Sequence, residues 1–215
     1  MHPSHLHALA ALASLDVALV LLRNAQIAEA SETAASGDFG TLQAWRPGTG
    51  IRVAREHGDV LLDAVIRHVS ALVGPYAERG QRTDDTIRWL TAAALGDAHR
   101  HDQDPLDQLR EHLPAMTPST AASLARWVDE QDQAVRRLLG EPDDHQLWPG
   151  VACPSCDTAG ALALRMSGPA EDRVVVCTVV RCLCTGEGCG CRMPVKASGW
   201  RHIWTLTAIR ATLDS

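Results

Sequence analysis

The residues best suited to chemistry in this 215-residue chain are its cysteines, all of which lie between positions 153 and 191. The first two form a Cys-Pro-Ser-Cys knuckle, and the other five follow within a short span. A histidine follows the last of them after ten intervening residues. Thiolates and imidazole nitrogens converging from tight turns are the ligands of closed, structural zinc sites. The candidate ligands are Cys153, Cys156, Cys177, Cys182, Cys184, Cys189, Cys191 and His202.

Eight candidates are enough for two tetrahedral sites. The simplest sequential division gives the first ion the four ligands from Cys153 to Cys182, and the second ion the four from Cys184 to His202. An interleaved division uses the same residues, and a single ion would leave three thiols as spectators. We therefore expect Zn²⁺ as the cofactor, at one or two ions per chain.

The clustering of the cysteines favours a metal site in a reducing compartment over a disulfide framework, whose cysteines are usually spread along the chain. The Cys153–Cys156 knuckle also has the spacing of a thioredoxin-type redox pair. That chemistry needs a helix directly after the motif. Here the strand-like sequence DTAGALALRM follows, so we expect metal binding, not redox catalysis, and a cytoplasmic location.

Basic and aromatic residues accompany the last candidate ligand. They are Arg192, Lys196, Trp200 and Arg201. Arginine and lysine contact phosphates, and tryptophan stacks on bases, so these residues are candidates for nucleic-acid binding. The alternative is that Trp200 and Trp204 cover a small zinc core while His202 ligates the metal.

Catalytic motifs are missing from the sequence. It has no phosphate-binding loop, no dinucleotide fingerprint and no Ser-His-Asp pattern. A closed zinc site also lacks the open coordination position that a metal-dependent enzyme needs. We expect no enzyme activity and no small-molecule substrate.

Helical periodicity dominates the first 147 residues. We expect helices over residues 4–35, 59–74, 83–100, 104–113 and 117–140. Thr83 and Thr117 are the expected N-caps of the third and fifth helices, and Gly140 the expected end of the fifth. The segment 36–56, with four glycines and a proline, is expected to be a loop.

The helix expected over 4–35 carries two apolar stripes. One contains Leu12, Leu15, Leu19 and Leu22; the other contains Leu6, Leu9, Ala13, Val17, Val20 and Leu21. Two stripes indicate burial on more than one side, in a bundle or along a homodimer seam. Asp16 interrupts the apolar run and no basic residue precedes it, so we expect a buried helix and not a signal peptide or a membrane span.

The period changes after residue 147. The runs 161–166 and 173–180 are β-prone and are joined by the turn-rich segment 167–172, which predicts a β-hairpin. Residues 148–215 carry a net charge of +2, against −8 for the rest of the chain. The sequence thus predicts a mainly α protein: an N-terminal helical bundle (1–147) and a small C-terminal zinc-ribbon-like β-hairpin module (148–215).

The tail, with its Cys-Pro-x-Cys knuckle, its run from Cys177 to Cys191 and its His202-Ile203-Trp204 ending, resembles uncharacterised proteins of actinobacteria and their tailed phages. The resemblance covers roughly the last third of the chain. It implies a zinc-bearing tail and a bacteriophage or prophage setting, and no reaction.

Two functions fit these features. The first is a non-catalytic zinc-binding phage-type accessory protein that binds nucleic acid through its C-terminal module. The second is a structural or adaptor protein, within a virion or docked on a phage or host protein, that forms oligomers through its first helix. A salt-dependent interaction with nucleic acid separates the two.

Overall fold

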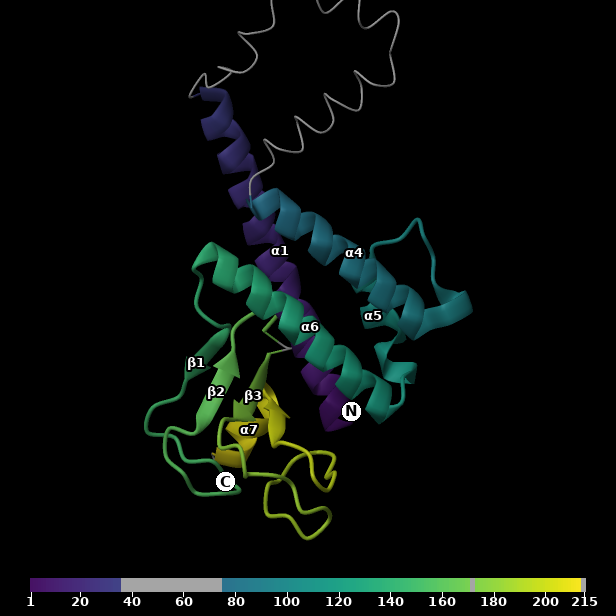
Figure 1. The fold of residues 1–215 in the computed structure, drawn as a ribbon. Coiled ribbons are helices and arrows are strands. Elements are labelled where there is room, and N and C mark those ends of the chain that lie inside the picture. The colour runs from purple at the N-terminus through teal and green to yellow at the C-terminus, as the bar shows by residue number, and fades with distance from the viewer. Residues whose placement is uncertain (36–74, 171–172, 214–215) are drawn as a thin grey trace, which may run out of the picture. The chain divides into compact units, whose positions relative to one another are not determined.

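The computed structural model describes residues 1–35, 75–170 and 173–213 of the chain (Figure 1). The expected loop at 36–56 and the expected helix at 59–74 lie outside the described residues. The chain divides into two compact units, Met1–Val20 with Thr83–Ser215, and Leu21–Arg82. The first unit contains all the candidate ligands.

The first helix, α1 (Pro3–Ala35), buries one of its two predicted stripes. Leu12, Leu15, Leu19 and Leu22 are at most 5% exposed. In the second stripe Leu6 is buried, whereas Val17 and Val20 are 40% and 49% exposed. The helix therefore turns one apolar face inward and leaves part of the other at the surface of the described structure.

The apolar part of α1, Pro3–Ala28, is long and hydrophobic enough to cross a bilayer by length and composition, and 61% of its most apolar window is buried in the structure. Buried core helices and signal sequences share this property, so it is weak evidence for a membrane span.

The next described helix, α4 (Pro75–Leu95), begins eight residues before the predicted N-cap. Thr83 lies fully buried inside this helix, so the predicted cap is wrong. Proline is well suited to a first helical turn, and an exposed Glu78–Arg82 ion pair one turn apart supports the added segment. A 3₁₀ turn, η2 (Gly96–Ala98), follows α4, and its Gly96 has φ +54°. The predicted continuation of the helix to residue 100 is therefore also wrong.

The next two helices have side-chain N-caps; that of α5 was not predicted, whereas both predicted ends of α6 are confirmed. In α5 (Pro105–His112) the Asp104 carboxylate accepts a hydrogen bond from the Leu106 amide at 2.8 Å. A 3₁₀ turn, η3 (Leu113–Ala115), leads to α6 (Pro118–Leu139). The Thr117 hydroxyl accepts from the Thr120 amide at 3.2 Å, and Gly140 ends α6 with φ +69°.

A four-stranded antiparallel sheet follows, in the order β1 (His145–Leu147), β2 (Leu162–Arg165), β3 (Val174–Cys177), β4 (Ile203–Thr205). The β2–β3 pair is the predicted hairpin, with Leu162 opposite Cys177. No strand was expected before residue 148, and β1 corrects this. All three of its residues are exposed, so no alternating pattern marks it. Neither β4 nor the last helix, α7 (Leu206–Leu213), was predicted.

The two faces of the sheet bury different chemistry, as the two-residue period of a strand requires. One face carries Ala163, Val174, Val176 and Ile203, which pack with Leu6 and Ala10 of α1. The other face carries Leu162, Val175, Cys177 and Trp204, which pack with the remaining cysteines and Ile209 of α7. The predicted domain boundary at 147/148 stays a prediction; the structure shows that β1 and β2, on either side of it, pair in one sheet.

A buried ion pair within α6 is hydrogen-bonded to α1. Asp132 and Arg136 are 4% and 7% exposed. The Arg136 Nε donates to the Asp132 carboxylate at 3.0 Å, and the Ser14 hydroxyl donates to the same carboxylate, also at 3.0 Å. Burial raises the pKa of Asp132, and the charge of Arg136 opposes that effect. Loss of Arg136 would leave the Asp132 carboxylate buried without its cationic partner.

We predict that Arg136→Met lowers the free energy of unfolding by about 3–5 kcal/mol, because it leaves the Asp132 charge buried without its partner. Arg82→Ala, which breaks the exposed pair with Glu78, should cost less than about 1 kcal/mol. Chemical denaturation monitored by circular dichroism measures both. Equal, small effects of the two substitutions would contradict the assignment of a buried pair.

Candidate metal centre

The four cysteines expected at a first ion lie together in the structure. The sulfur atoms of Cys153, Cys156, Cys177 and Cys182 are all within 4.8 Å of one another. Cys153 and Cys182 are 4.0 Å apart, and Cys156 and Cys177 are 3.9 Å apart. All seven cysteines are free thiols.

A second group contains the other four candidates. The sulfur atoms of Cys184, Cys189 and Cys191 and a ring nitrogen of His202 are also within 4.8 Å of one another, and all four residues are buried. The distance from Cys189 Sγ to His202 Nε2 is 3.4 Å. The two groups have the same members as the sequential division of the ligands.

These distances suit a tetrahedral metal ion. Zinc–sulfur bonds of about 2.3 Å at tetrahedral angles place the sulfur atoms about 3.8 Å apart. The shorter zinc–nitrogen bond of about 2.0–2.1 Å places nitrogen and sulfur about 3.5 Å apart. The sulfur–sulfur separations are far longer than a disulfide bond of about 2.05 Å. Both donor sets therefore fit a closed four-coordinate ion without rearrangement.

The first group is built by a knuckle and by the end of a strand. Residues Ala152 and Ala159 form an isolated bridge that closes the knuckle. Within it, the Asp157 amide donates to the Cys153 carbonyl at 2.9 Å, and Asp157 itself has φ +55°. Cys177 is the last residue of β3, and Cys182 follows in the next turn. The register of the sheet therefore fixes the strand ligand against the knuckle.

The second group sits in a long loop between β3 and β4. A bridge between Leu183 and Arg201 closes the base of this loop. Gly186, at φ +93°, lets its own amide donate to the Cys184 sulfur at 3.4 Å. The Lys196 ammonium donates to the carbonyls of Glu187 and Cys189, at 3.0 and 2.7 Å. The loop is thus held in its bent form by hydrogen bonds.

In each group the pKa of one thiol is lowered and that of another is raised. In the first group, burial acts to raise the pKa of Cys156, but hydrogen bonds from Thr158 and the neighbouring thiols lower it to about 7. Burial raises the pKa of Cys177 to about 11. In the second group, burial opposes hydrogen bonds from the Thr185 amide and the His202 ring, which lower the pKa of Cys189 to about 5. Burial, with the adjacent Cys189 thiol, raises the pKa of Cys191 to about 12.

This division follows from repulsion and desolvation, because several buried thiolates cannot ionise side by side without a cation. A divalent ion supplies the missing charge and releases the remaining thiol protons. Metal affinity at both groups should therefore fall as the pH falls.

The two tryptophans that flank His202 in the sequence have different roles. Trp204 is fully buried, its indole N–H donates to the Cys191 carbonyl at 2.9 Å, and its ring stacks on His202. Trp200 is half-buried and lines two adjoining hollows of about 580 and 410 Å³ beside α6. Only Trp204 thus belongs to the core of the cysteine groups.

The two hollows together form a groove beside Trp200. Of the three other residues predicted to contact nucleic acid, one lines this groove. Arg201 lines the larger hollow, together with Arg126 of α6. Lys196 lies elsewhere, on the cysteine loop, and Arg192 donates to the Thr212 carbonyl at 3.3 Å. Sequence reasoning missed Arg126, because nothing in the sequence relates a residue of α6 to Trp200.

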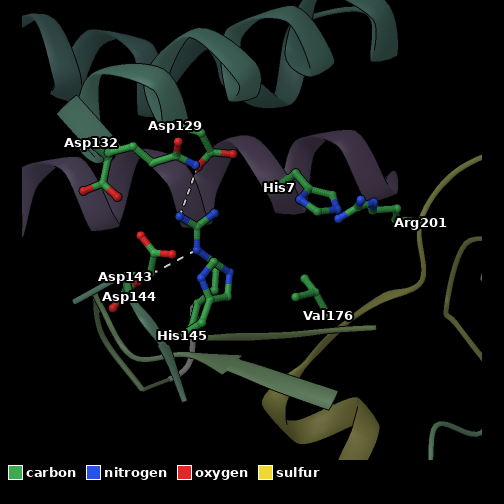
Figure 2. A pocket seen from close by; sticks show the side chains of 10 residues that line it. His7, Asp129, Asp132, Asp143, Asp144, His145, Val176 and Arg201 are labelled. Carbon is green, nitrogen blue, oxygen red and sulfur yellow. Dashed lines mark hydrogen bonds and ion pairs between the residues drawn. The ribbon is translucent and has the colours of Figure 1, made fainter. Parts of the chain in front are cut away.

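A polar crevice of about 200 Å³ lies between α6, α1 and the sheet, as Figure 2 shows. His7 and Arg201 face one another at one side, and Asp143 and His145 lie at the other. Arg165 donates to Asp129 at 3.0 Å and lies 3.8 Å from Asp144. Among the described residues, the donor groups that converge like metal ligands are the two cysteine groups. The crevice therefore contains ion pairs that link Arg165 of β2 to Asp129 of α6 and to Asp144.

Comparisons with protein-family models, curated proteins and solved structures give no significant match to this chain.

We predict that removing metal from the protein unfolds the strands β3 and β4 beside the cysteine groups, while α6 stays folded. A bound structural ion contributes roughly 10 kcal/mol or more to the folding of a small module. Hydrogen exchange followed by mass spectrometry, with and without a chelator, should show the amides of β3 and β4 losing protection while those of α6 keep theirs. Unchanged protection of β3 and β4 would show that the cysteine groups hold no structural ion.

Proposed function

We propose that the protein is a non-catalytic zinc-binding protein that holds two zinc ions. The observation that supports this is the convergence of eight donors, four in each group, from separate turns and strand ends. A four-sulfur set and a three-sulfur, one-nitrogen set are both common zinc environments. Soft thiolates favour zinc over magnesium or calcium, which prefer oxygen.

Four protein ligands for each ion leave no position for substrate or water, so the centre stabilises structure and is not a catalyst. The metal replaces part of a hydrophobic core, since the cysteines occupy the interior of one face of the sheet. We accordingly propose that function lies on the surfaces that the ions hold in place.

The groove beside Trp200 supports a further proposal, that the protein binds single-stranded nucleic acid. Trp200 offers a partly exposed ring for base stacking, and Arg126 and Arg201 offer charges for phosphates. Asp129 and Glu130 also line the hollow, which limits the affinity that charge alone provides. The resemblance to actinobacterial and phage proteins suggests an accessory role in phage replication, packaging or regulation.

The alternative proposal is an adaptor or virion component that associates through α1. The exposed residues Val17 and Val20 support it, because their spacing places them on one side of the helix. This side offers an apolar surface to a second copy or to another protein.

The zinc proposal is tested by elemental analysis of the purified full chain. We expect about two zinc ions per chain, the number that eight ligands in closed tetrahedral sites can hold. Cys156→Ser should reduce the content to about one ion, because it removes a first-group ligand. His101→Asn, which alters a histidine outside both groups, should leave the content unchanged. A metal-free protein whose tail stays folded would contradict the proposal.

The nucleic-acid proposal is tested by fluorescence anisotropy of labelled single-stranded DNA over a range of salt concentrations. Trp200→Ala should weaken binding by about 1–3 kcal/mol through lost stacking. Arg126→Ala should lower the slope of log affinity against log salt by about 0.7, the value for one phosphate contact on a single strand.

Two matched variants serve as controls for this experiment. Trp127→Ala removes an exposed tryptophan that packs against Trp89, and Arg137→Ala removes an exposed arginine of α6 outside the groove. Both should leave the affinity unchanged. Absence of binding at low salt would contradict the nucleic-acid proposal, and a dimer in light scattering would then favour the adaptor.

A further inference from the structure

His202 lies between the two cysteine groups and reaches both. Its Nε2 is 3.4 Å from the Cys189 sulfur of the second group, and its Nδ1 is 3.1 Å from the Cys182 sulfur of the first. The residue is fully buried, and its ring is fixed by stacking on Trp204. A single side chain therefore touches ligands of both candidate ions.

The chemistry of imidazole assigns a different role to each nitrogen. A ring that binds a metal through Nε2 carries its proton on Nδ1 and usually donates it to a nearby acceptor. Here the nearest acceptor given by the structure is the Cys182 sulfur. In the metal-bound protein this sulfur is a thiolate, and a charge-assisted hydrogen bond to it is stronger than a neutral one.

The knuckle of the first group makes a reciprocal contact. Ser155, which stands between Cys153 and Cys156, has its hydroxyl oxygen 3.8 Å from the Cys189 sulfur and 3.3 Å from His202 Nε2. With Nε2 on a metal, this hydroxyl has the Cys189 thiolate as its acceptor. Each group thus supplies a polar contact to a ligand of the other.

We propose that the two zinc sites form one coupled centre, in which His202 ligates the second ion through Nε2 and its Nδ1–H stabilises the Cys182 thiolate of the first. This inference rests on the proposed zinc binding. Occupation of either site then orders a contact used by the other, so each ion raises the affinity for its neighbour. By linkage, the coupling is the same in both directions.

The variant that tests the coupling is His202→Cys in the full chain. The new thiol can still ligate the second ion, but it has no N–H for Cys182. Loss of such an outer contact typically weakens metal binding about 10-fold to 100-fold. We therefore expect the affinity of the first site to fall by at least about 10-fold, although its four cysteines are unchanged. Competition with a chromogenic chelator, using zinc alone, measures this.

Lys196→Met is the matched control. The Lys196 ammonium donates to backbone carbonyls of the loop that carries the second group, and the structure gives it no contact with the first group. It should weaken the second site and, at zinc concentrations that keep the second site filled, leave the affinity of the first unchanged. Equal first-site affinity in wild type and His202→Cys would overturn the coupling while leaving zinc binding intact. Failure of the wild type to bind zinc would instead overturn the proposed function.

A second measurement needs no variant and covers the case in which His202→Cys does not fold. The wild-type protein is loaded with NMR-active cadmium and labelled with nitrogen-15 at histidine. We expect Nε2 of His202 to show direct coupling to one cadmium, and the Nδ1 proton to show a small coupling to the other across the hydrogen bond. A first-site cadmium bound directly to His202, or a ring bound to neither ion, would overturn the proposal.

Discussion

The structure of the tail depends on the burial of ionisable sulfur. Six of the seven cysteines are at most 7% exposed, and they share one core with Leu162, Val175 and Trp204. Buried thiols are inert when neutral, but as neighbouring thiolates they repel one another and lose solvation. The split pKa values, low at Cys156 and Cys189 and high at Cys177 and Cys191, express that conflict. A divalent cation in each group resolves it.

This constraint accounts for how such short strands form a stable sheet. The strands have three or four residues each, fewer than the five or six that are typical. One face of the sheet gains aliphatic contacts from α1 through Leu6 and Ala10. On the other face the donors come from the knuckle, the end of β3, the long loop and the residue before β4. Two ions, one in each group, would together hold these four segments and supply the cross-links that a larger apolar core would otherwise provide.

The parts of this architecture that the sequence predicts are those with local signals. Thr117 and Gly140 mark the ends of α6 because capping chemistry acts within one turn. The β2–β3 hairpin follows from two β-prone runs and a turn between them. The prediction of Thr83 as an N-cap was wrong because its capping signal competes with Pro75, which starts the helix earlier. The strand β1 gave no signal because its side chains are all exposed. Likewise, only tertiary structure separates buried Trp204 from half-buried Trp200 and brings Arg126 beside the latter.

Backbone hydrogen bonds join the second cysteine group to the groove beside Trp200. The Cys184 amide donates to the Trp200 carbonyl at 2.7 Å, and the Gly199 amide donates to the Cys184 carbonyl at 2.8 Å. Cys184 is a ligand in the second group, whereas Gly199 and Trp200 line the groove. A displacement of Cys184 on metal loss must therefore move the backbone that carries the Trp200 ring. If the groups hold ions as proposed, the occupancy of the second group would influence the shape of the surface on which the proposed binding takes place.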